Sequence, residues 1–286
     1  MTRFLPIALA GLLAAAALLG ARAAEPAGEK LPPLDLLVVA PHPDDEALGC
    51  TAVMLQALEQ KQRVGVVLLT NGDAFAGVTA VAKKPLDQVV PADYLKLAAV
   101  RQQHTVGAMG RIGVKAADLL FLGYPDGGLE ALYRAAGNEP YQQKHTEKKE
   151  TYGVVVRDYH TLTHGLSAPY TKASVIGDLT EIIKARQPKE IFVTNEADTH
   201  ADHRAAFWFV RDAARAAGWR GNLFTYAVHG KGPAEAPGRR LMLTKAQQDR
   251  KRAVIEEYQA GLSPLHDNLA AKYATAEEVF WPVRVK

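Results

Sequence analysis

The sequence has only one cysteine, Cys50, in 286 residues, so no disulfide can form within the chain. A protein without disulfides must rely on its core and on any bound metal, and a closed zinc site built from several cysteines is excluded. Lys and Arg number 34 against 31 Asp and Glu, with no long basic run, so nucleic acid is not an expected partner. The sequence also lacks the glycine-rich loop that binds the phosphates of dinucleotides.

Long apolar runs are absent beyond the N-terminus. Residues 5–19 follow Arg3 and are almost wholly apolar, and Ala21-Arg22-Ala23-Ala24 is a small-residue cleavage pattern. This predicts a signal peptide over residues 1–24, because the apolar run is shorter than the roughly 20 residues that span a bilayer. We therefore expect an exported protein, periplasmic or secreted, with no stable membrane span after cleavage. An uncleaved anchor is the alternative.

Apolar runs typical of buried strands alternate with helical patterns along the rest of the chain. The predicted strands cover residues 36–40, 63–70, 118–122, 190–194 and 222–228. This order predicts an α/β fold, a Rossmann-like three-layer sandwich with a mostly parallel sheet and helices on both faces. Residues 25–286 are long enough for one large domain.

Residues 129–171 interrupt this regular pattern. The span holds half of the ten tyrosines, and long irregular segments in compact domains are usually functional. We predict an insertion or lid. Its tyrosines either stack on sugar rings or pack the insertion against itself, and the sequence leaves both readings open.

Two predicted strand ends combine histidine with carboxylates. His42-Pro43-Asp44-Asp45-Glu46 follows the strand at 36–40, and His200-Ala201-Asp202-His203 follows the strand at 190–194. Parallel strands place their carboxyl ends at one edge of the sheet, where such folds bind ligands. Clustered acids there are costly without a cation, and two histidines with a carboxylate and an open position are typical of catalytic zinc. The simpler reading of each cluster is a helix start, where acids complement the helix dipole.

A metal with an open position indicates hydrolysis of an amide or ester. It lowers the pKa of bound water and polarises a carbonyl, while a carboxylate takes the proton and a further histidine stabilises the oxyanion or protonates the leaving nitrogen. Asp73 ends a turn, Thr70-Asn71-Gly72-Asp73, after another strand. It is either an acid beside the site or an ordinary turn residue.

The motifs resemble those of the PIG-L/LmbE-like zinc N-deacetylases. The segment Ala40-Pro41-His42-Pro43-Asp44-Asp45-Glu46 resembles the first signature of that family, and His200-Ala201-Asp202-His203 its second, usually His-Pro-Asp-His. Leu122-Gly123-Tyr124-Pro125-Asp126-Gly127 is similar to the family's loop after the third strand. The resemblance covers about residues 36–259, with the irregular span as a gap.

This resemblance implies a site and a reaction. The implied metal is Zn²⁺, with another divalent metal as the alternative, held by His42, Asp45 and His203. Asp44 would be the general base and His200 the electrostatic or acid partner. Arg101, Asp73 and Asp126 are expected to bind substrate. The implied reaction removes the N-acetyl group of an N-acetylglucosamine-type sugar or glycoconjugate by attack of a metal-bound water.

The sequence departs from the family at three points. Ala201 replaces the usual proline, His104 stands where glutamate often follows the arginine by three residues, and the insertion after Asp126 differs. The acceptor side of the substrate pocket is therefore not predicted. Two alternatives stay open, a hydrolase of another N-acyl or ester bond and a non-catalytic glycan-binding protein on the same fold. The expected partner is a small-molecule or glycan substrate, and the sequence does not indicate an oligomeric state.

Overall fold

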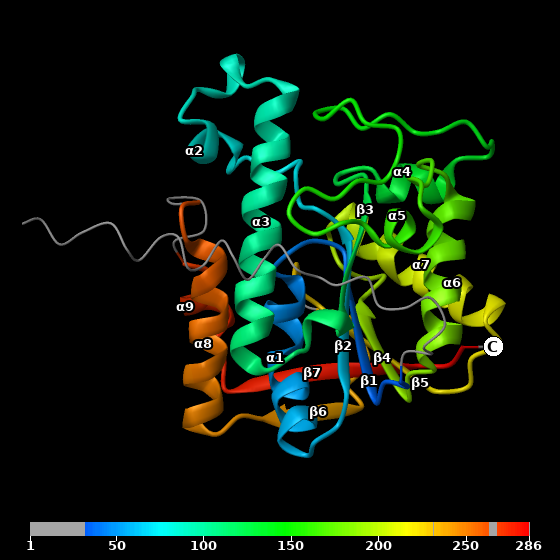
Figure 1. Ribbon diagram of the computed structural model, residues 1–286. Helices are drawn as coiled ribbons and strands as arrows, with labels where there is room; N and C mark the ends of the chain where they lie inside the picture. Colours follow the sequence, from blue (N-terminus) through cyan, green and yellow to red (C-terminus); the bar gives the residue numbers. More distant parts are fainter. Residues whose placement is uncertain (1–31, 231, 263–267, 286) are drawn as a thin grey trace, which may run out of the picture. The chain divides into compact units, whose positions relative to one another are not determined.

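The computed structural model describes residues 32–230, 232–262 and 268–285 (Figure 1). From Pro33 on, the chain forms one compact unit. The predicted signal peptide lies outside the described residues, so both its presence and the limits of the predicted domain stay predictions. Among the helices that are described, none combines the length and apolarity needed to cross a bilayer.

The described part of the chain contains a seven-stranded sheet in the order β3-β2-β1-β4-β5-β7-β6. Strands β1 to β5 pair in parallel, whereas β7 runs antiparallel to both of its neighbours. The strands are β1 (Leu36–Ala40), β2 (Val64–Thr70), β3 (Leu119–Tyr124), β4 (Glu190–Thr194), β5 (Asn222–Tyr226), β6 (Arg239–Met242) and β7 (Glu277–Val283).

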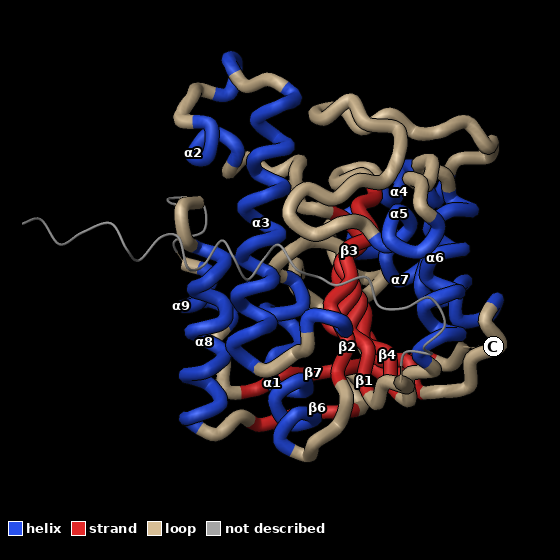
Figure 2. The backbone as a smooth tube through the Cα atoms, viewed as in Figure 1, coloured by secondary structure: helices blue, strands red, loops and turns tan. Residues whose placement is uncertain are grey.

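Helices cover both faces of this sheet (Figures 1 and 2). Alternate side chains of β1 enter two separate cores: Leu36 and Val38 pack with α1, α3 and α8, and Leu37 and Val39 pack with α6 and α7. The described helices are α1 (Asp45–Glu59), α2 (Val78–Ala82), α3 (Pro91–Ile112), α4 (Leu129–Arg134), α5 (Tyr159–His164), α6 (Lys172–Arg186), α7 (Ala201–Ala216), α8 (Lys245–Gln259) and α9 (Leu269–Tyr273), with 3₁₀ turns at Leu86–Gln88 and Ala116–Asp118.

This arrangement confirms the predicted α/β sandwich. The central strands β1 and β2 are buried along their whole length, as continuous apolar runs require when both faces of a sheet are covered. The apolar pattern of the sequence does not predict strands β6 and β7. Strand β7 contains the buried acid Glu278, and the buried Lys251 forms an ion pair with it at 2.6 Å. This partner is not apparent from the sequence around Glu278.

The tyrosines of the 129–171 span pack against the protein. Tyr170 donates to the carbonyl of Gly123 at 3.0 Å, and Tyr133 donates to Asp212 at 2.6 Å. Tyr152 donates to Asp73 at 2.5 Å. These contacts favour the reading in which the tyrosines hold the span to the body of the protein, and α4 and α5 give it local regular structure.

Close packing of α1 on β5 depends on Gly49. A Cβ at this position would overlap the Cδ2 atom of Tyr226. We expect Gly49→Ala to lower the free energy of unfolding by about 1–3 kcal/mol, as overpacking of a core does. Gly177→Ala is the matched control, because Gly177 is exposed within α6 and an added methyl group would have no atom within 4 Å.

The control should instead stabilise the protein by about 0.5–1 kcal/mol, since alanine restricts the unfolded chain and favours the helix. Urea unfolding followed by circular dichroism measures both changes. Equal effects of the two substitutions would contradict this packing.

Candidate metal centre

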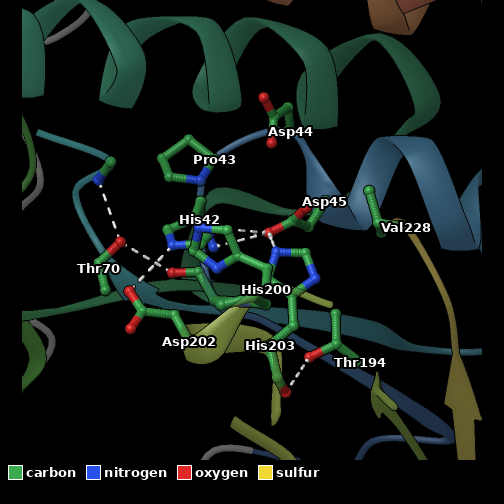
Figure 3. Close-up of polar contacts among 12 residues, drawn as sticks. His42, Pro43, Asp44, Asp45, Thr70, Thr194, His200, Asp202, His203 and Val228 are labelled. Atoms are coloured by element: carbon green, nitrogen blue, oxygen red, sulfur yellow. Dashed lines mark hydrogen bonds and ion pairs between the residues drawn. The ribbon is translucent and has the colours of Figure 1, made fainter. Parts of the chain in front are cut away.

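The turn between β1 and α1 and the turn between β4 and α7 lie at one edge of the sheet, because β1 and β4 are parallel neighbours. His42 lies in the first turn, His200 is the N-cap of α7, and His203 lies at the start of that helix. The ring centroid of His42 lies 4.9 Å from that of His200 and 5.2 Å from that of His203. The structure thus brings together two segments about 160 residues apart (Figure 3).

Asp45 connects the two segments. Its Oδ2 atom lies 3.1 Å from Nδ1 of His42 and 3.2 Å from Nε2 of His203. His203 is fully buried, yet its Nε2 atom makes no hydrogen bond of acceptable geometry among the described residues. A buried ring nitrogen that faces a carboxylate without hydrogen-bonding it is the arrangement expected of two ligands of one ion.

Further carboxylates surround these rings. Nε2 of His42 lies 3.2 Å from both Asp126 and Asp202. Asp45, Asp126 and Asp202 thus place three carboxylates in one buried site, and their negative charge needs a positive charge for balance. Burial lowers the pKa of His203, but the neighbouring carboxylates of Asp45 and Asp198 raise it to about 9. The His203 ring therefore carries this positive charge when the protein holds no metal. A divalent metal would supply this charge directly, and the residues fit it.

Asp198 was not among the residues selected from the sequence. Its Oδ2 atom lies 3.2 Å from Nδ1 of His203 and accepts the amides of Val228 at 3.1 Å and His229 at 3.0 Å. His229 was also missed, although one of its ring nitrogens lies within 4.8 Å of a carboxylate oxygen of Asp45 and a ring nitrogen of His203. The only local signal for Asp198 was its position at the carboxyl end of a strand, five residues before His203.

Asp44 has a strained backbone, with φ 123° and ψ −32°. Its amide donates to Glu46 at 3.2 Å, and its carboxylate accepts from Nη2 of Arg101 at 2.9 Å. Arg101 also donates to the carbonyl of Gly72 at 3.0 Å and to that of Pro43. Arg101 is buried, and these hydrogen bonds fix the turn that carries Asp44.

Burial raises the pKa of Asp44 to about 6, and Arg101 opposes this rise. The pKa of His200 is lowered to about 4, mainly by burial and then by the positive charge of the neighbouring His42. The site therefore combines a carboxylate whose proton affinity is raised with an imidazole that is neutral near pH 7. These are the properties of a base and of a neutral hydrogen-bond donor.

A cavity of about 240 Å³ opens onto these groups. Its lining includes the predicted residues His42, Asp44, Asp45, Arg101, Asp126 and His200, together with Leu48, Ala74, Phe75, His229, Leu269 and Tyr273. Asp73 is not part of this lining. Its side chain is buried behind it against Tyr152, and burial together with Asp126 raises its pKa to about 7. His203 also lies behind the lining, beneath Asp45.

A comparison with protein-family models decides the family. The family model for PIG-L, described as GlcNAc-PI de-N-acetylase, matches residues 37–214, which is more than half of the chain. The chain belongs to the PIG-L family. The matched region runs from β1 into α7 and includes both turns that form the site. No curated protein sequence matches the chain.

Several solved structures are similar to this PIG-L family member. The conserved protein TT1542 from Thermus thermophilus is 23% identical, with 88% of this chain and 96% of that chain covered and a TM-score of 0.54. N,N'-diacetylchitobiose deacetylase from Pyrococcus horikoshii is 16% identical, with coverages of 87% and 84% and a TM-score of 0.54. GalB, the 4-carboxy-2-hydroxymuconate hydratase from Pseudomonas putida, is 14% identical, with coverages of 87% and 95% and a TM-score of 0.55. At these identities, the likeness shows the fold.

The contact between Asp198 and His203 predicts a measurable effect on metal affinity. A carboxylate that hydrogen-bonds a ligating histidine fixes the ring and raises its basicity, and its loss typically weakens metal binding about 10–100-fold. We expect Asp198→Asn to weaken Zn²⁺ binding by this factor in calorimetric titration of the metal-free protein. Asp35→Asn is the control, because Asp35 precedes β1 at the opposite end of that strand. Equal affinities of the two variants would contradict the role of Asp198.

Proposed function

We propose that this PIG-L family protein is a metal-dependent N-deacetylase acting on an N-acetylglucosamine-type sugar or glycoconjugate. The observation that carries the proposal is the shared position of Asp45 between His42 and His203, with Asp44 held beside them at the cavity. A metal-dependent hydrolytic site needs metal ligands, a separate base and space for substrate. These residues offer all three.

His42, Asp45 and His203 would hold the metal. Two imidazoles and one carboxylate are a ligand set typical of catalytic zinc, although affinity alone does not select zinc over other divalent metals. When bound, such a metal lowers the pKa of water and polarises a carbonyl oxygen. Asp198 would orient His203, and Asp126 and Asp202 would orient His42, by the contacts described above.

Asp44 would act as the general base. Its carboxylate lines the cavity, and Arg101 fixes its position through the hydrogen bond at 2.9 Å. It would take a proton from the attacking water as the oxygen bonds to the acetyl carbon, and then return the proton to the nitrogen as the carbon–nitrogen bond breaks. The products would be a free amine and acetate.

His200 would stabilise the negative charge that develops on the acetyl oxygen. The ring lines the cavity and packs edge-on to His42, with centroids 4.9 Å apart. Because its pKa is lowered to about 4, the ring is neutral and can donate one N–H without carrying a full charge. A donor placed in advance where charge develops is a major source of catalysis in such sites.

The substrate class is proposed from two sources. The cavity combines charged and polar groups with Phe75 and Tyr273, a mixture suited to the hydroxyls and the apolar faces of a sugar. The family model carries the description GlcNAc-PI de-N-acetylase, and one similar structure is a diacetylchitobiose deacetylase. Both names support an N-acetylated amino sugar as the substrate.

A metal-dependent reaction on another bond is the second candidate. The similar structure of a hydratase favours keeping it, since one fold supports different reactions. A non-catalytic glycan-binding protein is favoured less, because binding alone does not require a strained, buried Asp44 next to the ligand set.

We also propose that the protein is exported, on the basis of the predicted signal peptide at residues 1–24. An exported deacetylase would meet an envelope glycan, a secreted saccharide or a glycoconjugate. Detection of the mature protein in the cytosol alone would contradict this part of the proposal.

Acetate release from a panel of N-acetylated sugars tests the function. We expect release from at least one N-acetylglucosamine derivative, loss of release after treatment with a chelator, and recovery when Zn²⁺ or another divalent metal is added back. The panel includes acetate esters and other N-acyl compounds to separate the second candidate. Release that persists fully in metal-free protein would contradict a metal-dependent reaction.

The substitution Asp44→Asn separates the base from the metal ligands. Asparagine tolerates positive φ as aspartate does and keeps the side-chain shape, so the turn should persist. We expect the rate of acetate release to fall about 10²–10⁴-fold, the usual contribution of general base catalysis, while bound metal stays at the wild-type level. Asp87→Asn, at an exposed acid, is the control. An unchanged rate in Asp44→Asn would show that the base is another group.

A further inference from the structure

A second group of histidines and acids lies between α5 and α6. His160 and His164 are one helical turn apart on α5, and their ring centroids are 4.3 Å apart. Nδ1 of His160 lies 2.7 Å from Oδ1 of Asp178, and Nε2 of His164 lies 2.9 Å from Oε2 of Glu181. This cluster shares no residue with the cavity or with the metal centre described above.

We propose that His160, His164 and Asp178 form a second binding site for a divalent transition metal such as Zn²⁺, Co²⁺ or Ni²⁺. One candidate ligand atom from each of the three residues lies within 4.8 Å of the other two. Imidazole nitrogens favour these ions, whereas Mg²⁺ and Ca²⁺ require sites built from oxygen ligands. Two histidines at positions i and i+4 of a helix present their rings on the same side, as metal sites on helices require.

Asp178 is held in place before any ion arrives. Its side chain is 2% exposed, and the hydroxyl of Tyr124 donates to its Oδ2 atom at 2.7 Å. This bond leaves Oδ1 directed at His160, where it contacts Nδ1. A hydrogen bond to the far oxygen of a ligating carboxylate is the feature that orients ligands in established metal sites. A chance surface contact would have no such buried support.

The other groups leave the site open to solvent. The side chains of His160 and His164 are 21% and 38% exposed, so an ion can enter without unfolding. Glu181 is 49% exposed and already contacts His164, which makes it available as a fourth ligand. The exposed pair of His164 and Glu181 contributes little to stability in water, so its replacement by metal bonds carries little penalty.

An ion at this site would join the insertion to the body of the protein. Helix α5 belongs to the 129–171 span, whereas α6 covers the sheet through its buried face. Figure 1 shows the two helices beside each other on one side of the sheet. The same span reaches the cavity wall, because Gln143 donates to the carbonyl of Asp126 at 3.0 Å. Metal binding would therefore stabilise the span that packs beside the catalytic cavity.

Counting bound metal tests the proposal whether or not the first site is catalytic. Tag-free, metal-free wild-type protein and the variant His160→Asn/His164→Asn are saturated with Zn²⁺, and bound zinc is measured by calorimetry and elemental analysis. We expect the variant to bind one equivalent fewer than the wild type. His145→Asn, a substitution of another histidine in the insertion, is the matched control and should bind as the wild type does.

Thermal unfolding supplies a second readout. Zinc should raise the Tm of wild type and of His145→Asn more than that of His164→Asn, a single exposed substitution that leaves the buried packing unchanged. Tyr124→Phe should weaken binding at this site about 10–100-fold through the lost bond to Asp178. Equal zinc stoichiometry in the wild type and the double variant, or an unchanged affinity in Tyr124→Phe, would overturn the proposal.

Discussion

The close approach of Asp45 to His42 and His203 is the interaction on which the rest of the site depends. One carboxylate oxygen lies 3.1 Å and 3.2 Å from ring nitrogens of two segments that are far apart in sequence. The parallel pairing of β1 with β4 produces this approach, because both turns leave the sheet at the same edge. Burying these charges is unfavourable unless each is compensated, so the acids of the site need either a protonated imidazole or a bound cation beside them.

The same constraint explains the surroundings of the site. Arg101 is buried in α3, far from the ligands in sequence, yet it compensates Asp44 and ties the carbonyls of Pro43 and Gly72 together. Its guanidinium therefore stabilises the strained turn in which Asp44 sits. This strain is confined to one residue between β1 and α1, where a rigid strand and a long helix fix both ends.

Much of this could be predicted from the sequence, because the deciding signals are local. The apolar runs of β1 to β5 have no stable position except a covered sheet, and the histidines and acids follow two of these strands directly. Strand β7 could not be predicted, since its buried Glu278 is stabilised by Lys251 from α8. Asp198 and the clamp by Arg101 were missed for the same reason: their partners come from other elements, and only the folded structure brings them together. The roles of the predicted site residues remain proposals.

The most direct test of the central claim is anomalous diffraction at the zinc absorption edge from crystals of the zinc-loaded protein. The account predicts a peak bonded to His42, Asp45 and His203, at about 2.0–2.2 Å from one atom of each. It also predicts that Asp44 and His200 lie beside the ion without binding it. Zinc bound elsewhere with His42 and His203 left unligated, or a closed shell of four protein ligands, would contradict it.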